Sequence, residues 1–380
     1  MTSPSAERLA RVALCRLGEP GDPRLTSLVA ELGAVEVYEF LLNEQGPSGV
    51  ATDVAARLGG LDPAGDLERA ARLGIRFVTP EDAEWPAGLA DLDRAEAVHR
   101  RAGSPLGLWV RGVGRLDELC RRSVAVVGSR SATSYGTGVA RELAAGLTAE
   151  HVTVVSGAAF GIDAAAHRGA LAARGPTVAV LACGVDRAYP LAHRDLLSYI
   201  ADTGLVVSEL PPGCAPTKLR FLARNRVIAA LSLGTVVVEA AVRSGALNTA
   251  NWASGCGRVV MGVPGPVTSA PSEGVHELIR QRDAALVTRA DDVLELVSPA
   301  GTHVQALRRA PERVWDRLCE VDQQVLDAVP AQAAAPAASI ARTAGLAAGT
   351  VRESLTRLRT EGLAESGPRG WRLAPRAGAP

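Results

Sequence analysis

Between residues 123 and 287 the sequence alternates short, continuously apolar runs with longer segments of helical periodicity. A strand that is apolar on both sides has to be covered on both sides, as in a parallel sheet with helices on each face. The seven runs are residues 124–127, 152–155, 178–181, 205–207, 235–238, 259–263 and 285–287. We therefore expect an α/β fold, an extended Rossmann-like, doubly wound and mostly parallel sheet.

The chain before and after this region has a different pattern of apolar residues. Residues 1–74 carry apolar residues at near-helical spacing, broken by the turn sequence 46–49, and predict a small helical domain of the SAM-like kind. Residues 75–120, with a strand-like run at 108–111, extend the main domain to 75–297. A Pro-, Gly- and Arg-rich linker is expected at 298–314. Residues 315–376 follow the order helix, helix, turn, helix, hairpin, which predicts a winged-helix domain.

Charge composition limits the partners of the chain. Its 41 basic and 41 acidic residues give a net charge of +0, so the whole molecule has no general attraction to nucleic acid or anionic membranes. Any site for a polyanion must be a local patch. Residues 1–74 hold 7 Arg against 11 Asp or Glu, net −4, whereas residues 342–376 hold 7 Arg against 3 Glu, net +4.

The cysteines and the apolar runs predict a cytoplasmic protein without a bound cofactor. The six cysteines form no CxxC pair and none lies beside a histidine at metal-ligand spacing, so we expect reduced thiols and no structural metal. The N-terminus lacks the apolar segment of a signal peptide. No apolar run reaches the ~20 residues of a membrane helix, and we expect no membrane contact.

Glycine-rich turns follow the first two apolar runs. The first run leads through Ser129 and Arg130 to Gly136, and the second leads through a turn that contains Gly157 and Gly161. Ligands of doubly wound sheets bind at the carboxyl ends of the strands, and backbone amides ahead of a helix together with an arginine can bind phosphate. The first turn lacks the GxGxxG dinucleotide fingerprint. Phosphate binding and ordinary tight turns both remain open.

Residues 218–226 hold four positive charges, no negative charge and one aromatic ring. The members of this segment that we single out are Lys218, Arg220, Phe221, Arg224, Asn225 and Arg226. Cations for phosphates, an amide for base edges and a ring for stacking are the groups that bind nucleic-acid strands. We expect this segment to precede an apolar helix at 227–233 and its arginines to face solvent. The alternative is a solvated helix start with Phe221 in the core.

A carboxylate and another helix start follow the fifth run. Glu239 comes directly after the run, and Ser244 and Gly245 open a helix. This pattern fits an anion-binding turn or a carboxylate for sugar chemistry. His167 is expected to be a packed or surface histidine, because no serine or cysteine nucleophile accompanies it.

Taken in order, these motifs resemble the DNA-processing protein A family, DprA or Smf, most strongly over residues 75–297. The motifs are Gly128-Ser129-Arg130, Ser156-Gly157 with Gly161-Ile162-Asp163, Tyr189-Pro190, Ser208-Glu209, Phe221 with Arg224-Asn225-Arg226, Glu239, Ser244-Gly245 and Val263-Pro264-Gly265. The resemblance implies a homodimeric, non-catalytic protein that binds single-stranded DNA. It also implies natural transformation as the process, loading of the RecA recombinase, and single-strand-binding protein as a further partner.

The resemblance also indicates DNA contacts. They are Ser129, Arg130, Phe221, Arg224, Asn225 and Arg226, to which we add Gly136, Gly157, Gly161, Lys218, Arg220, Ser244 and Gly245 from the turns and helix starts described above. The sequence departs from the family at three places. Phe160 replaces a usual basic residue, Leu222 replaces a proline, and Val275-His276 replaces a small polar pair in the segment where the family is thought to dimerise.

Two other function classes compete with this interpretation. A nucleotide phosphoribohydrolase of the Lonely Guy type uses a related sheet and a Pro-Gly-Gly-x-Gly-Thr-x-x-Glu motif. Here three residues separate Thr235 from Glu239 and no Pro-Gly-Gly precedes them, so the carboxylate is misplaced for that chemistry. A transcriptional regulator that acts through residues 315–376 is the second alternative, as an added role. The DNA-binding mediator is the preferred hypothesis.

Overall fold

The structure, a computed structural model, describes residues 4–43, 60–281, 283–304 and 314–375. It divides into two compact units, residues 1–305 and 306–380, which are described separately below. The turn expected at 46–49, part of the linker expected at 298–314, and residue 376 lie outside the described residues. The finer division at residue 74 stays a prediction. None of the described helices combines the length and the apolarity that a membrane crossing requires.

The larger unit is built on a nine-stranded sheet in the order β1-β2-β6-β5-β4-β3-β7-β8-β9. The strands are β1 Ile75–Val78, β2 Leu108–Gly112, β3 Ser123–Val127, β4 Thr153–Ser156, β5 Thr177–Val180, β6 Leu205–Ser208, β7 Gly234–Val237, β8 Val259–Gly262 and β9 Ala285–Leu286. All neighbours from β6 to β9 are parallel, whereas β2 pairs antiparallel with both β6 and β1. The seven predicted strands and the strand-like run at 108–111, which is β2, are confirmed, and β1 is an addition that the sequence did not predict.

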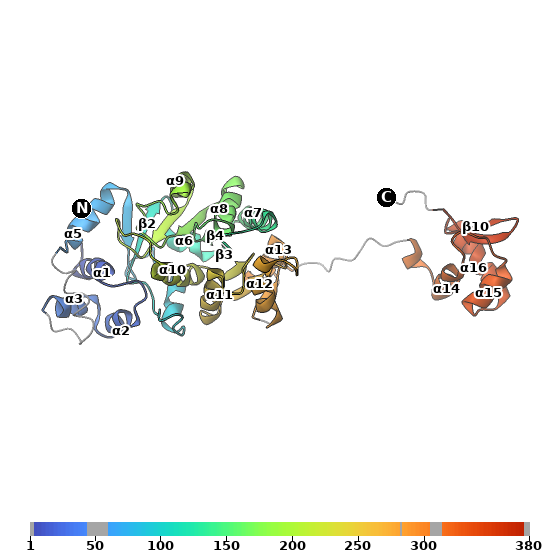
Figure 1. Ribbon diagram of the computed structural model, residues 1–380, viewed down its shortest axis with the longest axis horizontal. Helices are drawn as coiled ribbons and strands as arrows, with labels where there is room; N and C mark the ends of the chain where they lie inside the picture. The colour runs from blue at the N-terminus through green and yellow to red at the C-terminus, as the bar shows by residue number, and fades with distance from the viewer. Residues whose placement is uncertain (1–3, 44–59, 282, 305–313, 376–380) are drawn as a thin grey trace. The chain divides into compact units, whose positions relative to one another are not determined.

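Helices cover both faces of this sheet (Figure 1). The helices of one face are α7 Ser134–Ala149, α8 Ile162–Ala172, α9 Arg194–Thr203 and α13 Ala290–Val297; those of the other are α6 Leu116–Arg121, α10 Lys218–Ala230, α11 Gly245–Gly255 and α12 Ala270–Arg280. Val124 and Val126 of β3 pack into the core under α7 and α8, while Ala125 and Val127 pack into the core under α10 and α11. This alternation on a fully buried strand confirms the doubly wound α/β fold.

The strand order contains a reversal at β3. The chain passes from β3 outward through β4, β5 and β6, and then returns to the other side of β3 as β7. Helix α10 makes this return, because it connects β6 with β7. A reversal of this kind is the topological switch point at which open α/β sheets bind ligands, outside the carboxyl ends of the strands.

The N-terminal helices belong to the same compact unit as the sheet. They are α1 Ala6–Leu17, α2 Pro23–Leu32, α3 Ala34–Leu42 and α5 Pro63–Arg72. Leu14, Leu25 and Val37 form a small core among these helices. Val12 of α1 and Ala70 of α5 instead join the core that covers the β1 edge of the sheet. The helical segment is therefore packed against the sheet along one side of α1.

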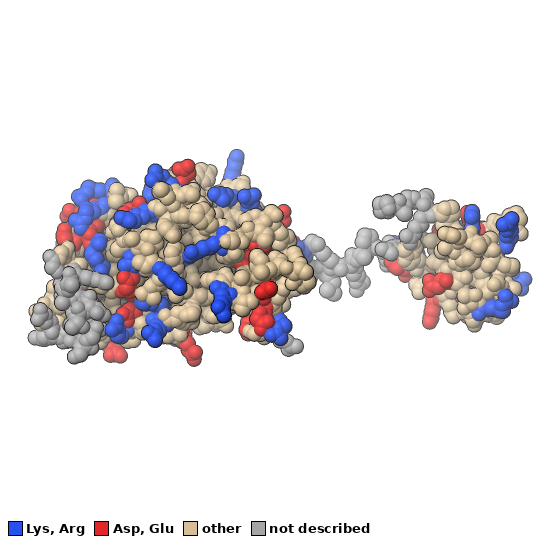
Figure 2. Space-filling model, viewed as in Figure 1, with Lys and Arg blue, Asp and Glu red and all other residues tan. Residues whose placement is uncertain are grey.

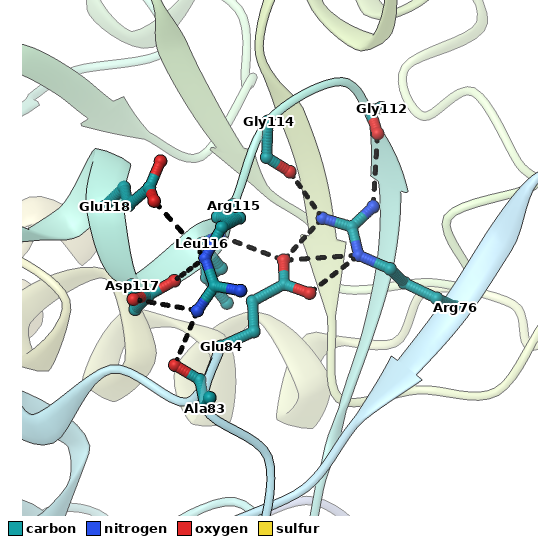
Figure 3. A network of polar contacts seen from close by, with 9 residues as sticks. All are labelled: Arg76, Ala83, Glu84, Gly112, Gly114, Arg115, Leu116, Asp117 and Glu118. Carbon is teal, nitrogen blue, oxygen red and sulfur yellow. Dashed lines mark hydrogen bonds and ion pairs between the residues drawn. The ribbon is translucent and has the colours of Figure 1, made fainter.

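A network of arginines and carboxylates holds β1, β2 and the start of α6 together (Figure 3). Arg76 donates from Nε to Glu84 at 2.9 Å and from Nη1 to the carbonyl oxygen of Gly112 at 3.1 Å. Arg115 donates from Nε to Asp117 at 3.1 Å. Each arginine of this network meets at least one carboxylate, so its charge is compensated within the fold.

The smaller unit has its own core. Its elements are a 3-10 turn at Val314–Arg317, the helices α14 Glu320–Ala328, α15 Ala337–Ala344 and α16 Ala348–Thr360, and the antiparallel strands β10 Ala364–Gly367 and β11 Gly370–Leu373. Gly345, with φ of 66°, ends α15 in the left-handed conformation. A hydrogen bond from Arg357 lowers the pKa of Asp322 to about 2 and joins α16 to α14. The predicted order of elements is present; the winged-helix assignment stays a prediction.

Candidate nucleic-acid interface

Loops from three strands and the start of α10 converge at the carboxyl edge of the sheet. The guanidinium carbon of Arg130, in the loop after β3, lies 4.6 Å from the ring centroid of Phe221 in α10. The guanidinium carbon of Arg224, one turn further along α10, lies 5.9 Å from the same centroid. Tyr189, in the loop after β5, places its ring centroid 5.6 Å from that of Phe221. We call Arg130, Tyr189, Phe221 and Arg224 the arginine–aromatic cluster.

Gly157 makes the room in which Arg224 lies. A Cβ atom at Gly157 would fall 1.5 Å from Nη1 of Arg224, so no other residue fits at this position without displacing the arginine. Nη1 donates to the carbonyl oxygen of Val180, the last residue of β5, at 3.0 Å. Nε of Arg224 is buried and has no hydrogen-bond partner among the described residues. The guanidinium is therefore held in place with donor capacity left over.

The charge balance around Arg224 is set by burial and by one acid. Burial lowers the pKa of Arg224, and the negative charge of Asp163 opposes that shift. Burial likewise raises the pKa of Asp163, against the effect of Arg224. Neither group forms an ion pair within 4.0 Å with a described residue in the structure. Arg224 thus remains a desolvated cation beside an aromatic ring, which is a strong setting for contact with an anion.

Gly161 allows the loops after β3 and β4 to lie against each other. Its φ of +75° favours glycine, and a Cβ atom there would fall 2.2 Å from the carbonyl oxygen of Ser129. The backbone N–H of Ile162 donates to the same oxygen at 3.2 Å. This close approach fixes the backbone at Ser129 and so positions Arg130, whose exposed side chain makes no hydrogen bond or ion pair with a described residue.

Glu239 occupies the N-terminus of α7. Its buried carboxylate accepts hydrogen bonds from the backbone N–H of Thr133, at 2.9 Å, and from the Thr133 hydroxyl. A Cβ atom at Gly136 would fall 2.3 Å from the carboxylate carbon, so this glycine makes room for it. The helix start that was expected to face a phosphate is thus already capped by an acidic side chain. Both of its oxygens serve the fold, which agrees with the spacing argument that this carboxylate is misplaced for sugar chemistry.

The basic segment lies inside α10 and not ahead of it, which corrects the expected helix start at 227. The helix begins at Lys218, and the Thr217 side chain caps it by accepting from the N–H of Arg220 at 3.3 Å. Residues 218–226 therefore point in directions set by a period of 3.6 residues. Arg224 and Arg226, expected to face solvent, are 7% and 0% exposed.

Two of the four cations of this segment are paired with carboxylates. Arg226 donates from Nη2 to Glu209 at 2.7 Å and from Nε to the carbonyl oxygen of Gly103 at 3.1 Å. Arg220 donates from Nε and Nη2 to the two oxygens of Glu19, at 2.9 and 2.8 Å, and this bond raises its pKa. These two arginines attach the segments around Gly103 and Glu19 to α10. Lys218 stays exposed at the helix start.

Three further predicted residues gather at the start of α11. Asn225 donates from Nδ2 to the carbonyl oxygen of Gly245 at 3.2 Å and to Oδ1 of Asn248 at 3.1 Å. The Ser244 hydroxyl caps α11 by accepting from the N–H of Ala246 at 3.3 Å. The structure brings these residues together with one another, and among the described residues no side-chain hydrogen bond, ion pair or ring contact joins them to the arginine–aromatic cluster.

The sequence reasoning missed two exposed aromatic residues near this edge. Tyr189 was part of a motif but not of the predicted site, although its side chain is 44% exposed beside Phe221. Phe160, noted only as a departure, is 49% exposed and lies 4.8 Å from the His193 ring, centroid to centroid. Their position in the sequence could have identified them as site residues, because both lie in turns that follow the carboxyl ends of strands.

His167 is packed in the interior, as expected. Its Nδ1 lies 2.8 Å from the Thr177 hydroxyl, which itself donates to the carbonyl oxygen of Val154 at 2.6 Å, so Nδ1 carries the proton. Burial, together with the charges of His193 and Arg224, lowers the pKa of His167 to about 3. Within the described residues, no group of three or more His, Cys, Asp or Glu is placed to hold a metal ion.

The distribution of charge on the larger unit agrees with these contacts. Figure 2 shows several basic side chains over the central part of this face, around the place where Figure 1 labels α10. A local basic patch is what a chain of +0 net charge needs in order to bind a polyanion.

Comparisons with known proteins point in one direction. Residues 76–298 match the profile of the family described as DNA recombination-mediator protein A. The chain is 46% identical over 381 residues to a protein of Mycobacterium tuberculosis (strain H37Rv) named for DNA processing protein DprA, covering 100% of this chain and 97% of that protein. It is 40% identical over 243 residues to the DNA processing protein DprA of Streptococcus pneumoniae. That match covers 64% of this chain and 85% of the pneumococcal protein.

Two solved structures resemble the fold. The crystal structure of DNA processing protein A from S. pneumoniae matches with a TM-score of 0.57 and 32% identity, over 78% of this chain and 99% of that one. The second structure is the DNA processing protein A of Helicobacter pylori, which was solved to describe its single-stranded DNA binding mode. It matches with a TM-score of 0.50 and 26% identity, over 58% of this chain and 94% of that one.

Proposed function

The chain belongs to the DNA recombination-mediator protein A family, and on this premise we propose that it binds single-stranded DNA through the arginine–aromatic cluster. The relative from H. pylori supports the ligand class, because it is described as binding single-stranded DNA. Bound in this way, the strand is handed to the RecA recombinase during DNA processing and natural transformation. The protein acts by binding and presenting the strand, without a catalytic step.

One observation carries this proposal: the Phe221 ring lies close to two guanidinium groups that have no carboxylate partner among the described residues. Arg130 is exposed, Arg224 is buried with an unsatisfied Nε, and both lie within 6 Å of the ring centroid. A ring that stacks on a base and cations that meet the flanking phosphates form a site for a single strand of any sequence. A duplex keeps its bases paired and gives the ring nothing to stack on.

Further features of the proposal rest on the family. They are a homodimer, a cytoplasmic location, single-strand-binding protein as a second partner, and a winged-helix role for the smaller unit. In that unit Arg369 lies exposed between β10 and β11, where a wing would contact DNA, whereas Arg372 is paired with Glu365. We assign Lys218 and Ser129 to the strand path as flanking contacts, and Gly136, Gly157 and Gly161 to its support through close backbone packing.

A binding titration tests the proposed function. Full-length protein is titrated into a fluorescent single strand and into a blunt duplex of the same sequence, at several salt concentrations. We expect tighter binding of the single strand and, for a short strand that makes about three phosphate contacts at the cluster alone, a slope near −2 of log affinity against log salt. Equal affinity for the blunt duplex would contradict the proposal, as would an Arg130→Glu variant that binds like the original chain.

A further inference from the structure

A groove of about 480 Å³ adjoins the arginine–aromatic cluster, on the α9 face of the sheet. Its walls include Arg111 of β2, Val206 of β6, three residues from the segment between β5 and α9, and the first residue of α9, Arg194. The three residues of that segment are Arg187, Tyr189 and Leu191. Arg111 and Val206 are direct cross-strand neighbours, so both side chains project from the same face of the sheet. The groove therefore combines an apolar floor with cations from three separate elements.

The three arginines of the groove are not compensated within the fold. Arg111, Arg187 and Arg194 make no side-chain hydrogen bond or ion pair with any described residue, unlike Arg76 and Arg115 on the same unit. The acidic residue of the groove wall, Asp186, is engaged elsewhere, because its carboxylate accepts from the N–H of Gly213 at 2.9 and 3.0 Å. The groove carries three positive charges against one negative charge.

Tyr189 connects the groove with the arginine–aromatic cluster. Its ring contacts Phe221 in the cluster and also lines the groove, and Leu191, two residues later, is 66% exposed there. A strand whose base stacks on Phe221 thus has a second aromatic ring beside it, at the entrance of a basic groove. The two sites are continuous through a single side chain.

We propose that this groove is a second subsite, which binds the next nucleotides of the same single strand, and the inference rests on the proposed function. The arginines contact successive phosphates, and Tyr189 and Leu191 contact the bases. The occupant is a strand and not a free nucleotide, because Tyr189 lines the groove and also contacts Phe221, so a strand bound at the cluster continues into the groove.

The test removes the three charges together. In the variant Arg111→Gln, Arg187→Gln, Arg194→Gln, affinity is measured for single strands of about four and about sixteen nucleotides, of which the shorter fills the cluster alone. The matched control is Arg121→Gln, Arg122→Gln, Arg174→Gln. These arginines are exposed, make no side-chain hydrogen bond or ion pair with described residues, and lie just before β3 or β5, at the opposite edge of the sheet.

We expect the groove variant to lose about tenfold or more in affinity for the longer strand and to flatten its salt slope by about 2, since three contacts each contribute about 0.7. Binding of the shorter strand and the thermal midpoint should stay the same, and the control should bind both strands as the original chain does. Equal losses in the two variants, or an equal loss on both strands, would overturn the subsite. So would tight binding of free thymidine monophosphate in the groove of an Arg130→Glu protein. If the original chain binds neither strand, the proposed function itself fails.

Discussion

Two groups of arginines in the larger unit differ in what lies against their positive charges: carboxylates in one group and an aromatic ring in the other. In the network of Figure 3, Arg76 and Arg115 each meet a carboxylate and backbone carbonyls, and they hold the β1 edge to α6. In the arginine–aromatic cluster, Arg130 and Arg224 meet the face of Phe221 and no carboxylate. A paired arginine stabilises the fold, whereas an arginine held by a ring keeps its charge for a ligand.

The same contrast occurs within one helix. Arg226 and Arg224 are two residues apart in α10, and both are buried. Arg226 is paired with Glu209, while Arg224 donates to one backbone carbonyl and keeps Nε free of any described partner. Burial alone does not distinguish a structural arginine from a binding arginine; the partner does.

The largest expected effect comes from breaking the structural pair. Arg226→Ala leaves Glu209 as an unpaired buried charge and should lower the free energy of unfolding by about 3–5 kcal/mol. Denaturant unfolding measures this loss. A double variant, Arg226→Met with Glu209→Leu, should recover most of it, because an apolar pair of similar size replaces both charges. A single variant as stable as the original chain would show that the pair has no structural role.

Reversing a charge in the cluster should act on binding and not on folding. Arg130→Glu should weaken single-strand binding about 100-fold, because it removes one phosphate contact and adds a repulsive charge. Fluorescence anisotropy measures the affinity. The matched control is Arg115→Glu, a partly exposed arginine of the Figure 3 network, which should lower stability and leave affinity unchanged. If Arg130→Glu instead lowers stability and Arg115→Glu lowers affinity, the distinction between binding and structural arginines is wrong.

A comparison of two ring pairs in the larger unit, Tyr189–Phe221 and Phe77–Trp109, offers a smaller test. Phe221→Ala should reduce binding by about 1–3 kcal/mol if the ring stacks on a base. The control is Phe77→Leu, because Phe77 packs 4.7 Å from Trp109, centroid to centroid, in the buried core. That change should cost about 1 kcal/mol of stability and leave affinity unchanged. A Phe221→Ala protein with lower thermal stability and full affinity would place this ring in the core.

Acid should destabilise the side of the fold that holds His167. Its pKa is about 3 in the folded chain and near 6.5 when unfolded, so the unfolded state binds the extra proton between these values. Stability is complete above about pH 6.5 and falls by up to about 1.4 kcal/mol per pH unit below it. Unfolding of the original chain and of His167→Gln, measured from pH 7 to pH 4, gives the difference. Parallel pH profiles would contradict this assignment.

The sequence predicted the strands because the sheet is buried on both faces. Runs such as 124–127 are apolar without interruption, and such runs fit only a covered parallel strand. Strand β1 was not predicted, since its four residues include Arg76, whose role in the Figure 3 network depends on contacts distant in the chain. The local pattern therefore identified the strands from β2 to β9 and missed the edge strand β1.

The site was predicted less completely for a similar reason. The basic residues 218–226 carry no apolar periodicity, so the helix was expected to begin only at residue 227. Its actual start at Lys218 depends on the cap at Thr217. The partner of Arg220 is Glu19, 201 residues away, and no local pattern reveals it. The motif residues Arg130, Phe221 and Arg224 do lie together, while the buried arginines had to be sorted by their partners in the structure.

Photo-crosslinking tests the central claim most directly. A single strand that carries bromodeoxyuridine is bound to the full chain, irradiated, and the attached peptides are identified by mass spectrometry. The account predicts crosslinks at Phe221 and Tyr189, and their loss in Arg130→Glu. Crosslinks confined to residues 314–375, with none on the larger unit, would show that the strand binds the smaller unit and that the arginine–aromatic cluster is not the site.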